Sequence, residues 1–213
     1  MSSVNQKNNY NRVASIYDRL AGIIFGSAIS RSQFSLLRYP LPGPRILIAG
    51  GGTGALLEEL GKTEAIPLQI TFVELSERML HKAQKRNAGI HEVRFICGAA
   101  EQLNTGHSFD VIITPFLFDN FTPAKAREVF GHLDNMLAPG GTWLFTDFCI
   151  DPDSPWWHSV LLRLMYGFFK ILAAVEANHL PDTGSLFAAA GYACEKELFF
   201  YRNFIRSALY RKY

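Results

Sequence analysis

Four glycines within five positions separate an apolar run from a run typical of a helix. Gly50, Gly51, Gly52 and Gly54 follow "RILIA" (45–49) and precede "ALLEEL" (55–60). Glycine permits a tight turn, lets a ligand approach the main chain where a Cβ would stand, and allows a helix to pack close to a sheet. The pattern predicts a strand–loop–helix unit that binds a ligand through its backbone, with an ordinary glycine-rich turn as the alternative.

A carboxylate ends the next strand-like run, "LQITFVE" (68–74). Glu74 follows the last glycine by about 20 residues, the spacing at which an acidic side chain binds ribose hydroxyls. The alternative is a solvated residue at a strand end. Two cofactors fit: Gly50-x-Gly52-x-x-Ala55 satisfies a relaxed dinucleotide pattern that suggests NAD, whereas Gly50-x-Gly52-x-Gly54 suggests S-adenosylmethionine.

Three side chains are candidates for moving a proton. Asp119 follows the fourth strand-like run, Asp147 lies near the end of the fifth, and His158 follows two tryptophans. Each also has a structural interpretation: a turn residue for Asp119, a buried hydrogen-bonded group for Asp147, and a packed ring for His158. The six histidines fit no metal-ligand spacing, so we expect no metal site.

Alternating strands and helices must position these groups. Strands are expected at "RILIA", "LQITFVE", "VRFIC" (93–97), "FDVIIT" (109–114) and "TWLFTDF" (142–148), with helices between them. We expect the helix "ALLEEL" to stop at Gly61, and another to follow Ser76 over "ERMLHKAQKRN". This rhythm predicts a mostly parallel sheet with helices on both faces, closed by an antiparallel hairpin over 192–212.

The bulk composition predicts one domain with a sizeable core. Of the 213 residues 48% are hydrophobic, and the formal net charge of +2 is too balanced for a nucleic-acid footprint. Three widely spaced cysteines form no disulfide framework, and the polar N-terminus resembles no signal peptide, so we expect a cytoplasmic protein. We expect no stable membrane insertion, because the longest apolar run is short and interrupted by charges.

Several motifs in order resemble the class I S-adenosylmethionine-dependent methyltransferases. "ILIAGGGTG" is similar to their first motif, "VELS" to the end of their second strand and "GAAEQL" (98–103) to their adenine loop. "FDVIITPFLFDNF" resembles their fourth strand and the loop beyond it, and "LAPGG" the turn before the fifth. "YNRVASIYDRLAG" resembles the N-terminal helix of the ubiquinone and menaquinone biosynthesis branch. The resemblance runs from about Tyr10 to the C-terminus.

The resemblance implies a Rossmann-like, seven-stranded α/β domain over 1–213. Its parts would be an N-terminal helical cap (1–40), a cofactor-binding core (45–149), an acceptor-side lid (150–180) and the terminal hairpin (192–212). The implied cofactor is S-adenosylmethionine, with S-adenosylhomocysteine as product. The implied cofactor-binding residues are Tyr17, Ala49, Gly50, Gly51, Gly52, Thr53, Gly54, Glu74, Leu75, Ser76, Met79, Ala99, Ala100, Glu101, Thr114 and Phe116.

Two positions depart from the family pattern. Ile48 replaces the acidic residue often found two positions before the first glycine, and the region of Asp119 and Asn120 replaces the histidine usual after the fourth strand. The methionine end of the cofactor would then depend on backbone carbonyls near Ala49 and Gly50 or on another side chain.

The most unusual segment is "WWHSVLLRLMYGFFKILAAV" (156–175). It is interpreted as a helix packed on the core, as an apolar lid over the acceptor, or as a helix lying transiently on a membrane surface. In the lid interpretation Phe118, Trp156 and Trp157 contact the acceptor. The sequence thus favours methyl transfer to a small, apolar or aromatic molecule by a monomer or homodimer. The alternatives are an NAD(P)-binding oxidoreductase and a non-catalytic nucleoside-binding module.

Overall fold

A computed structural model describes residues 24–63, 65–151, 153–173 and 179–212. The predicted contact from Tyr17, and most of the predicted N-terminal cap, lie outside these residues.

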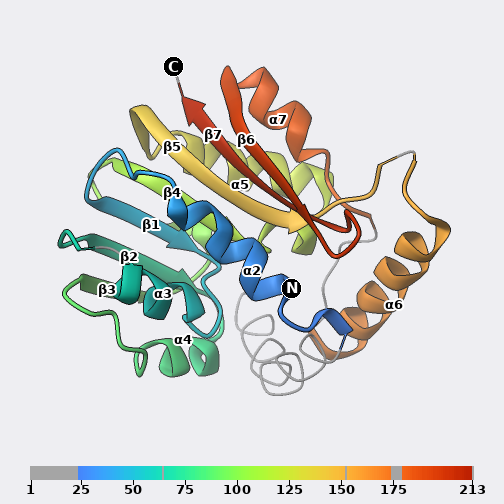
Figure 1. Ribbon diagram of the computed structural model, residues 1–213, viewed down its shortest axis with the longest axis horizontal. Coiled ribbons are helices and arrows are strands. Elements are labelled where there is room, and N and C mark those ends of the chain that lie inside the picture. The colour runs from blue at the N-terminus through green and yellow to red at the C-terminus, as the bar shows by residue number, and fades with distance from the viewer. Residues whose placement is uncertain (1–23, 64, 152, 174–178, 213) are drawn as a thin grey trace.

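The core is a seven-stranded sheet in the order β3-β2-β1-β4-β5-β7-β6 (Figure 1). All neighbouring pairs are parallel except those that involve β7, which runs antiparallel to both β5 and β6. The expected fold class, a mostly parallel sheet closed by an antiparallel hairpin, is therefore confirmed. The strands are β1 (Arg45–Ala49), β2 (Gln69–Glu74), β3 (Glu92–Cys97), β4 (Phe109–Pro115), β5 (Leu137–Phe148), β6 (Tyr192–Phe200) and β7 (Ile205–Lys212).

Helices cover both faces of the sheet, as the βα rhythm predicts. One face packs against α2 (Ala28–Ser35), α3 (Ala55–Thr63) and α4 (Glu77–Ala83), and the other against α5 (Pro123–Asp134) and α7 (Thr183–Ala189). β1 is buried on both faces, which explains its continuous apolar sequence. The short 3-10 helices η1 (Leu36–Arg38), η2 (Ala100–Gln102) and η3 (Phe118–Asn120) follow α2, β3 and β4.

Two element boundaries differ from the sequence-based expectation. α3 does not stop at Gly61 but continues to Thr63, and a Cβ on Gly61 would lie 2.7 Å from the carbonyl carbon of Ala88. Gly61 therefore serves close packing against a neighbouring loop rather than helix termination. α4 ends at Ala83, four residues earlier than expected, and a hydrogen-bonded turn follows it.

The long helix α6 (Trp156–Ala173) stands beyond the carboxyl end of β5 (Figure 1). Leu162, Met165 and Tyr166 face inward and join a cluster with Phe148 of β5 and Phe204. This confirms that one face of α6 packs on the core. No helix among the described residues is both long and apolar enough to cross a membrane.

Candidate active site

The glycine loop turns sharply between β1 and α3. Gly50 and Gly54 have φ values of 72° and 79°, in the left-handed region that favours glycine. The Gly50 amide donates a hydrogen bond to the Val73 carbonyl at 2.9 Å, and the Gly54 amide donates to the Gly51 carbonyl at 3.2 Å. The loop is thereby fixed against the end of β2, next to Glu74.

The glycines of this loop have different neighbours. A Cβ on Gly51 would lie 2.2 Å from the Phe72 ring, and one on Gly54 would lie 2.8 Å from Ala83 of α4. A Cβ on Gly52 would meet nothing within 4 Å. Gly51 and Gly54 thus permit close packing, whereas Gly52 leaves an open backbone face where a ligand can approach.

Glu74 connects the glycine loop to the end of β2. The residue is 7% exposed, and its carboxylate accepts hydrogen bonds from the Gly52 amide at 2.9 Å and the Ser76 amide at 2.8 Å. Burial raises the pKa of Glu74, and the hydrogen bonds from backbone amides oppose that shift. The structure therefore places Glu74 beside the glycine loop, as the sequence predicts.

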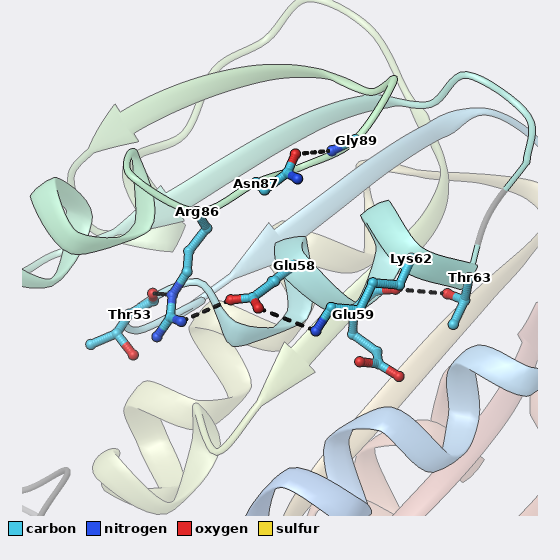
Figure 2. Close-up of polar contacts among 8 residues, drawn as sticks. All are labelled: Thr53, Glu58, Glu59, Lys62, Thr63, Arg86, Asn87 and Gly89. Atoms are coloured by element: carbon cyan, nitrogen blue, oxygen red, sulfur yellow. Dashed lines mark hydrogen bonds and ion pairs between the residues drawn. The ribbon is translucent and has the colours of Figure 1, made fainter.

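Arg86 is a residue that sequence reasoning missed. Its Nε donates to the Thr53 carbonyl at 3.1 Å, and its Nη1 lies 2.8 Å from Glu58 Oε2 of α3 (Figure 2). Glu58 also pairs with Lys62 on the same helix (Figure 2). Arg86 follows α4 and so connects three separate segments around the loop. The only signal in the sequence was a basic residue near a helix end, which does not reveal a contact 33 residues away.

The residues predicted to bind the adenine lie around the ends of β2 and β3. The Ser76 hydroxyl caps α4 by accepting from the Met79 amide at 3.3 Å, and Leu75 is half-buried. Ala99 precedes η2, Ala100 is buried at its start, and Glu101 pairs with Lys125 of α5 at 2.9 Å. Their predicted contacts with an adenine ring remain predictions.

The loop after β4 contacts the glycine loop directly. A Cβ on Gly50 would lie 3.0 Å from Leu117 Cδ1, so the two loops already touch there. Phe116 has a φ of 50°, unusual for a residue with a side chain, and its amide donates to the Thr146 carbonyl at 2.7 Å. This backbone turn carries the chain from β4 into η3.

Two predicted site residues near this loop are engaged in the core. The Thr114 hydroxyl accepts a hydrogen bond from Trp143 Nε1 at 2.9 Å and is fully buried. Phe118 is also fully buried, among the aromatic rings of Trp143, Phe145 and Phe130. The structure thus places Thr114 and Phe118 beneath the site, in the packing that supports it. Ile48 is likewise fully buried in the core on the α3 side.

Asp119 and Asp147 come together at the carboxyl ends of β4 and β5. They are 8% and 3% exposed, respectively. Asp147 Oδ2 accepts hydrogen bonds from the amides of Phe118 at 2.9 Å and Asp119 at 3.2 Å, and its Oδ1 accepts from Phe148 at 2.8 Å. Asp147 thereby holds η3, and both acids share one desolvated patch.

The surroundings of the two acids raise the pKa values of both carboxyl groups. Burial, and then the charge of Asp147, raises the pKa of Asp119 well above its usual value. Burial raises the pKa of Asp147 to about 7, although three backbone hydrogen bonds favour its ionised form. Two acids that cannot readily ionise together are suited to holding and transferring one proton.

Tyr166 of α6 faces the same patch and was not predicted. Its hydroxyl is buried, with no hydrogen-bond partner among the described residues. Burial, together with the charges of Asp119 and Asp147, raises its pKa. In the sequence Tyr166 stands inside an apolar helix, where nothing distinguishes it from a core residue.

The predicted acceptor residues of α6 separate into exposed and buried groups. Trp156 is 79% exposed, whereas Trp157 is half-buried, with its ring centroid 6.1 Å from that of Tyr201. His158 is buried against Phe204, and its ring nitrogens have no hydrogen-bond partner among the described residues. Burial lowers the pKa of His158. Among the described residues no group of His, Cys, Asp and Glu side chains is arranged to hold a metal ion.

Comparison with known families agrees with this geometry. Residues 46–141, which contain the glycine loop, Glu74 and Asp119, match the family described as "Methyltransferase domain". This match covers somewhat less than half of the chain, and over these residues the chain is similar to methyltransferase domains. The match agrees with the family resemblance noted in the sequence.

A curated protein similar to this chain is carboxy-S-adenosyl-L-methionine synthase of Trichodesmium erythraeum (strain IMS101). It is 27% identical over 145 residues, which cover 67% of this chain and 56% of the relative. The chain therefore spans about half the length of this curated relative.

Three solved structures share the fold over most of the chain. Magnesium protoporphyrin IX methyltransferase (ChlM) from Synechocystis PCC 6803, with bound SAH, has a TM-score of 0.72 at 15% identity and covers 97% of this chain and 98% of its own. The cyclopropane synthase MmaA2 from Mycobacterium tuberculosis has a TM-score of 0.68 at 14% identity, and the match covers 86% of this chain and 84% of MmaA2. The DhpI–SAH complex has a TM-score of 0.70 at 16% identity, and the match covers 99% of this chain and 96% of DhpI.

Proposed function

We propose that this protein transfers the methyl group of S-adenosylmethionine to a small-molecule acceptor. The observation that carries the proposal is the junction of Glu74 with the open backbone at Gly52. A nucleoside lying along this junction meets main-chain groups on one side and a buried carboxylate on the other. The S-adenosylhomocysteine complexes of ChlM and DhpI, which share the fold, support this choice of cofactor over NAD(P).

The cofactor would lie across the carboxyl ends of β1, β2 and β4. Glu74 would accept hydrogen bonds from the ribose hydroxyls through the oxygen lone pairs not used by the Gly52 and Ser76 amides. Leu75 would pack on the adenine, with Ala100 at its edge. Leu117 and Phe116 would adjoin the methionine end, because their loop touches the glycine loop.

Methyl transfer from a sulfonium is an in-line displacement whose leaving group is already activated. The protein must therefore hold donor and acceptor in line and exclude water. The ring centroids of Phe116 and Phe148 lie 4.9 Å apart on the acceptor side, next to the inward face of α6. These aromatic surfaces favour an apolar or aromatic acceptor.

Titration calorimetry with S-adenosylmethionine, S-adenosylhomocysteine and NAD tests the cofactor assignment. We expect micromolar or tighter binding of the first two and none of NAD; binding of NAD alone would overturn the proposal. An acceptor-library screen that follows S-adenosylhomocysteine release then tests catalysis. Cofactor binding without turnover of any acceptor would favour the non-catalytic module.

A further inference from the structure

The acid pair of Asp119 and Asp147 has an asymmetric environment. Asp147 accepts three backbone hydrogen bonds, which stabilise its carboxylate form. Asp119 Oδ1 accepts a side-chain hydrogen bond from Asn120 Nδ2 at 2.7 Å, and the backbone amides of Asp119 and Asn120 oppose the effect of burial on its pKa. Since the two buried acids repel each other when both are charged, their surroundings favour a pair that holds one proton, and Asp147 is the better stabilised carboxylate of the two.

The acid pair adjoins the place where the donor would bind. Leu117, two residues before Asp119, lies against Gly50 of the glycine loop. β1 and β4 are also neighbours in the sheet, so their carboxyl ends open on the same edge. A sulfonium held on the glycine loop would bring its positive charge next to the loop that carries Asp119.

The described groups around the acid pair supply no positive charge to it, so the sulfonium of a bound donor is a suitable counter-charge. α6 contributes the neutral Tyr166, and the chain directly after β5 contributes Cys149, whose pKa burial raises to about 12. On β7, Arg206 is opposite Asp147 in the strand register but is bonded to Glu197 and to the Tyr210 hydroxyl. No cation of the described residues therefore forms an ion pair with Asp119 or Asp147.

We propose that the acid pair releases its proton when the sulfonium of the donor binds and regains a proton from the acceptor during methyl transfer. The inference rests on the proposed function. It assigns the acceptor to the class that carries a transferable proton on oxygen or nitrogen. The Tyr166 hydroxyl, which is buried and has no hydrogen-bond partner in the part of the chain that the structure describes, would hydrogen-bond that group and orient it.

The step balances in atoms and charge. Before transfer, the doubly ionised pair faces the sulfonium cation, for a local charge of −1. The acceptor O–H or N–H group attacks the methyl carbon, the carbon–sulfur bond breaks, and its electron pair stays on sulfur. The acceptor proton passes to Asp119, so that a singly charged pair faces a neutral thioether and the local charge is again −1.

Calorimetry in two buffers with different ionisation enthalpies, at neutral pH, measures the proton linked to binding. We expect S-adenosylmethionine to release close to one proton, about 0.5–1, and neutral S-adenosylhomocysteine to release almost none. Asp119→Asn should abolish this difference and keep S-adenosylhomocysteine affinity within about twofold. Asp151→Asn, an exposed acid beyond β5, should behave like the wild type.

Three results would overturn the inference: equal proton changes for both ligands, release that persists in Asp119→Asn, or turnover of an acceptor without a transferable proton, such as a thioether or tertiary amine. If Asp119→Asn fails to fold, carbon NMR of labelled aspartates in the wild type replaces it. A near-neutral carboxyl titration must then move to lower pH with S-adenosylmethionine but not with S-adenosylhomocysteine. Failure to bind either ligand would refute the proposed function instead.

Discussion

The Gly52 amide donates a hydrogen bond to Glu74 Oε2 at 2.9 Å. This contact joins the turn after β1 to the end of β2, two segments that the chain separates by the whole of α3. It fixes the direction of the carboxylate before any ligand is present. A pre-oriented carboxylate reduces the ordering cost of binding a ribose.

Glu74→Gln should weaken the binding of S-adenosylmethionine roughly tenfold or more, because hydrogen bonds to a charged acceptor are the stronger ones. Calorimetry measures the loss. Glu77→Gln, an exposed acid in the first turn of α4, is the matched control and should change the affinity little. Equal affinities for Glu74→Gln and the control would remove Glu74 from the cofactor site.

Alanine at two adjacent glycines should have different consequences. Gly51→Ala should lower the free energy of unfolding by about 1–3 kcal/mol, because its Cβ would overlap the Phe72 ring. Gly52→Ala strains a residue with a φ of 59°, at a cost of about 1–2 kcal/mol, and also places a methyl group on the open face. Denaturant unfolding measures the loss of stability and calorimetry the loss of affinity for S-adenosylmethionine. For the same loss of stability, Gly52→Ala should lose more affinity than Gly51→Ala.

Arg86→Ala should loosen the glycine loop by removing the bond to the Thr53 carbonyl and the ion pair with Glu58. Because both side chains of the pair are partly exposed, the change in stability should be small. The affinity for S-adenosylmethionine should fall a few-fold. Lys85→Ala, the exposed neighbour, is the control, and an indistinguishable affinity in the two variants would contradict the prediction.

Stability should fall as the pH rises from about 4, the usual pKa of an aspartate in the unfolded chain, through about 7, the pKa of Asp147 in the folded protein. The folded-state pKa values of Asp119 and Asp147 lie above their unfolded values, so the folded protein holds more protons and loses this advantage as the pair ionises. The lowered pKa of Asp110 acts at more acidic pH, outside this window. Thermal unfolding should show that the stability of Asp119→Asn depends less on pH than that of the wild type. An equally steep dependence in the two proteins would refute the conclusion that Asp119 and Asp147 share one proton.

The lid interpretation of α6 distinguishes its two adjacent tryptophans. Trp157→Ala should weaken acceptor use and leave S-adenosylmethionine affinity intact, since its half-buried ring lies on the inward side. Trp156→Ala, at an exposed position, should change neither. Steady-state kinetics with an acceptor found by the screen, together with calorimetry, make the comparison. Equal losses of acceptor use and cofactor affinity for Trp157→Ala would count against the lid.

The exposed face of α6 carries a stripe of apolar side chains. Trp156, Val160 and Leu164 recur at four-residue intervals and are exposed, whereas Leu162, Met165 and Tyr166 are buried. The amphipathic pattern follows from the sequence, but the surface that the exposed stripe contacts does not. The structure shows only that core packing accounts for one of its two faces.

Local sequence determined the strand–loop–helix unit, the position of Glu74 at a strand end and the final hairpin. These features depend on short-range causes: apolar runs, glycine at positive φ, and a hydroxyl cap before α4. The strand β1 has the predicted bounds, and the Thr122 cap of α5 accepts from the Lys125 amide. By contrast, the end of α3 was not predictable from Gly61, because the packing of a distant loop determines it.

The sequence by itself determined that glycines and a carboxylate would meet at one edge of a parallel sheet. Only the tertiary structure decided which charges gather there. It brought Asp119 and Asp147 into one buried patch and bonded Arg86 to the glycine loop. It also placed beside the two acids the Tyr166 hydroxyl, which finds no hydrogen-bond partner within the described ranges. The physical reason is that a pKa, or the need for a hydrogen-bond partner, depends on desolvation and on neighbours far apart in the chain, and neither is encoded in local spacing.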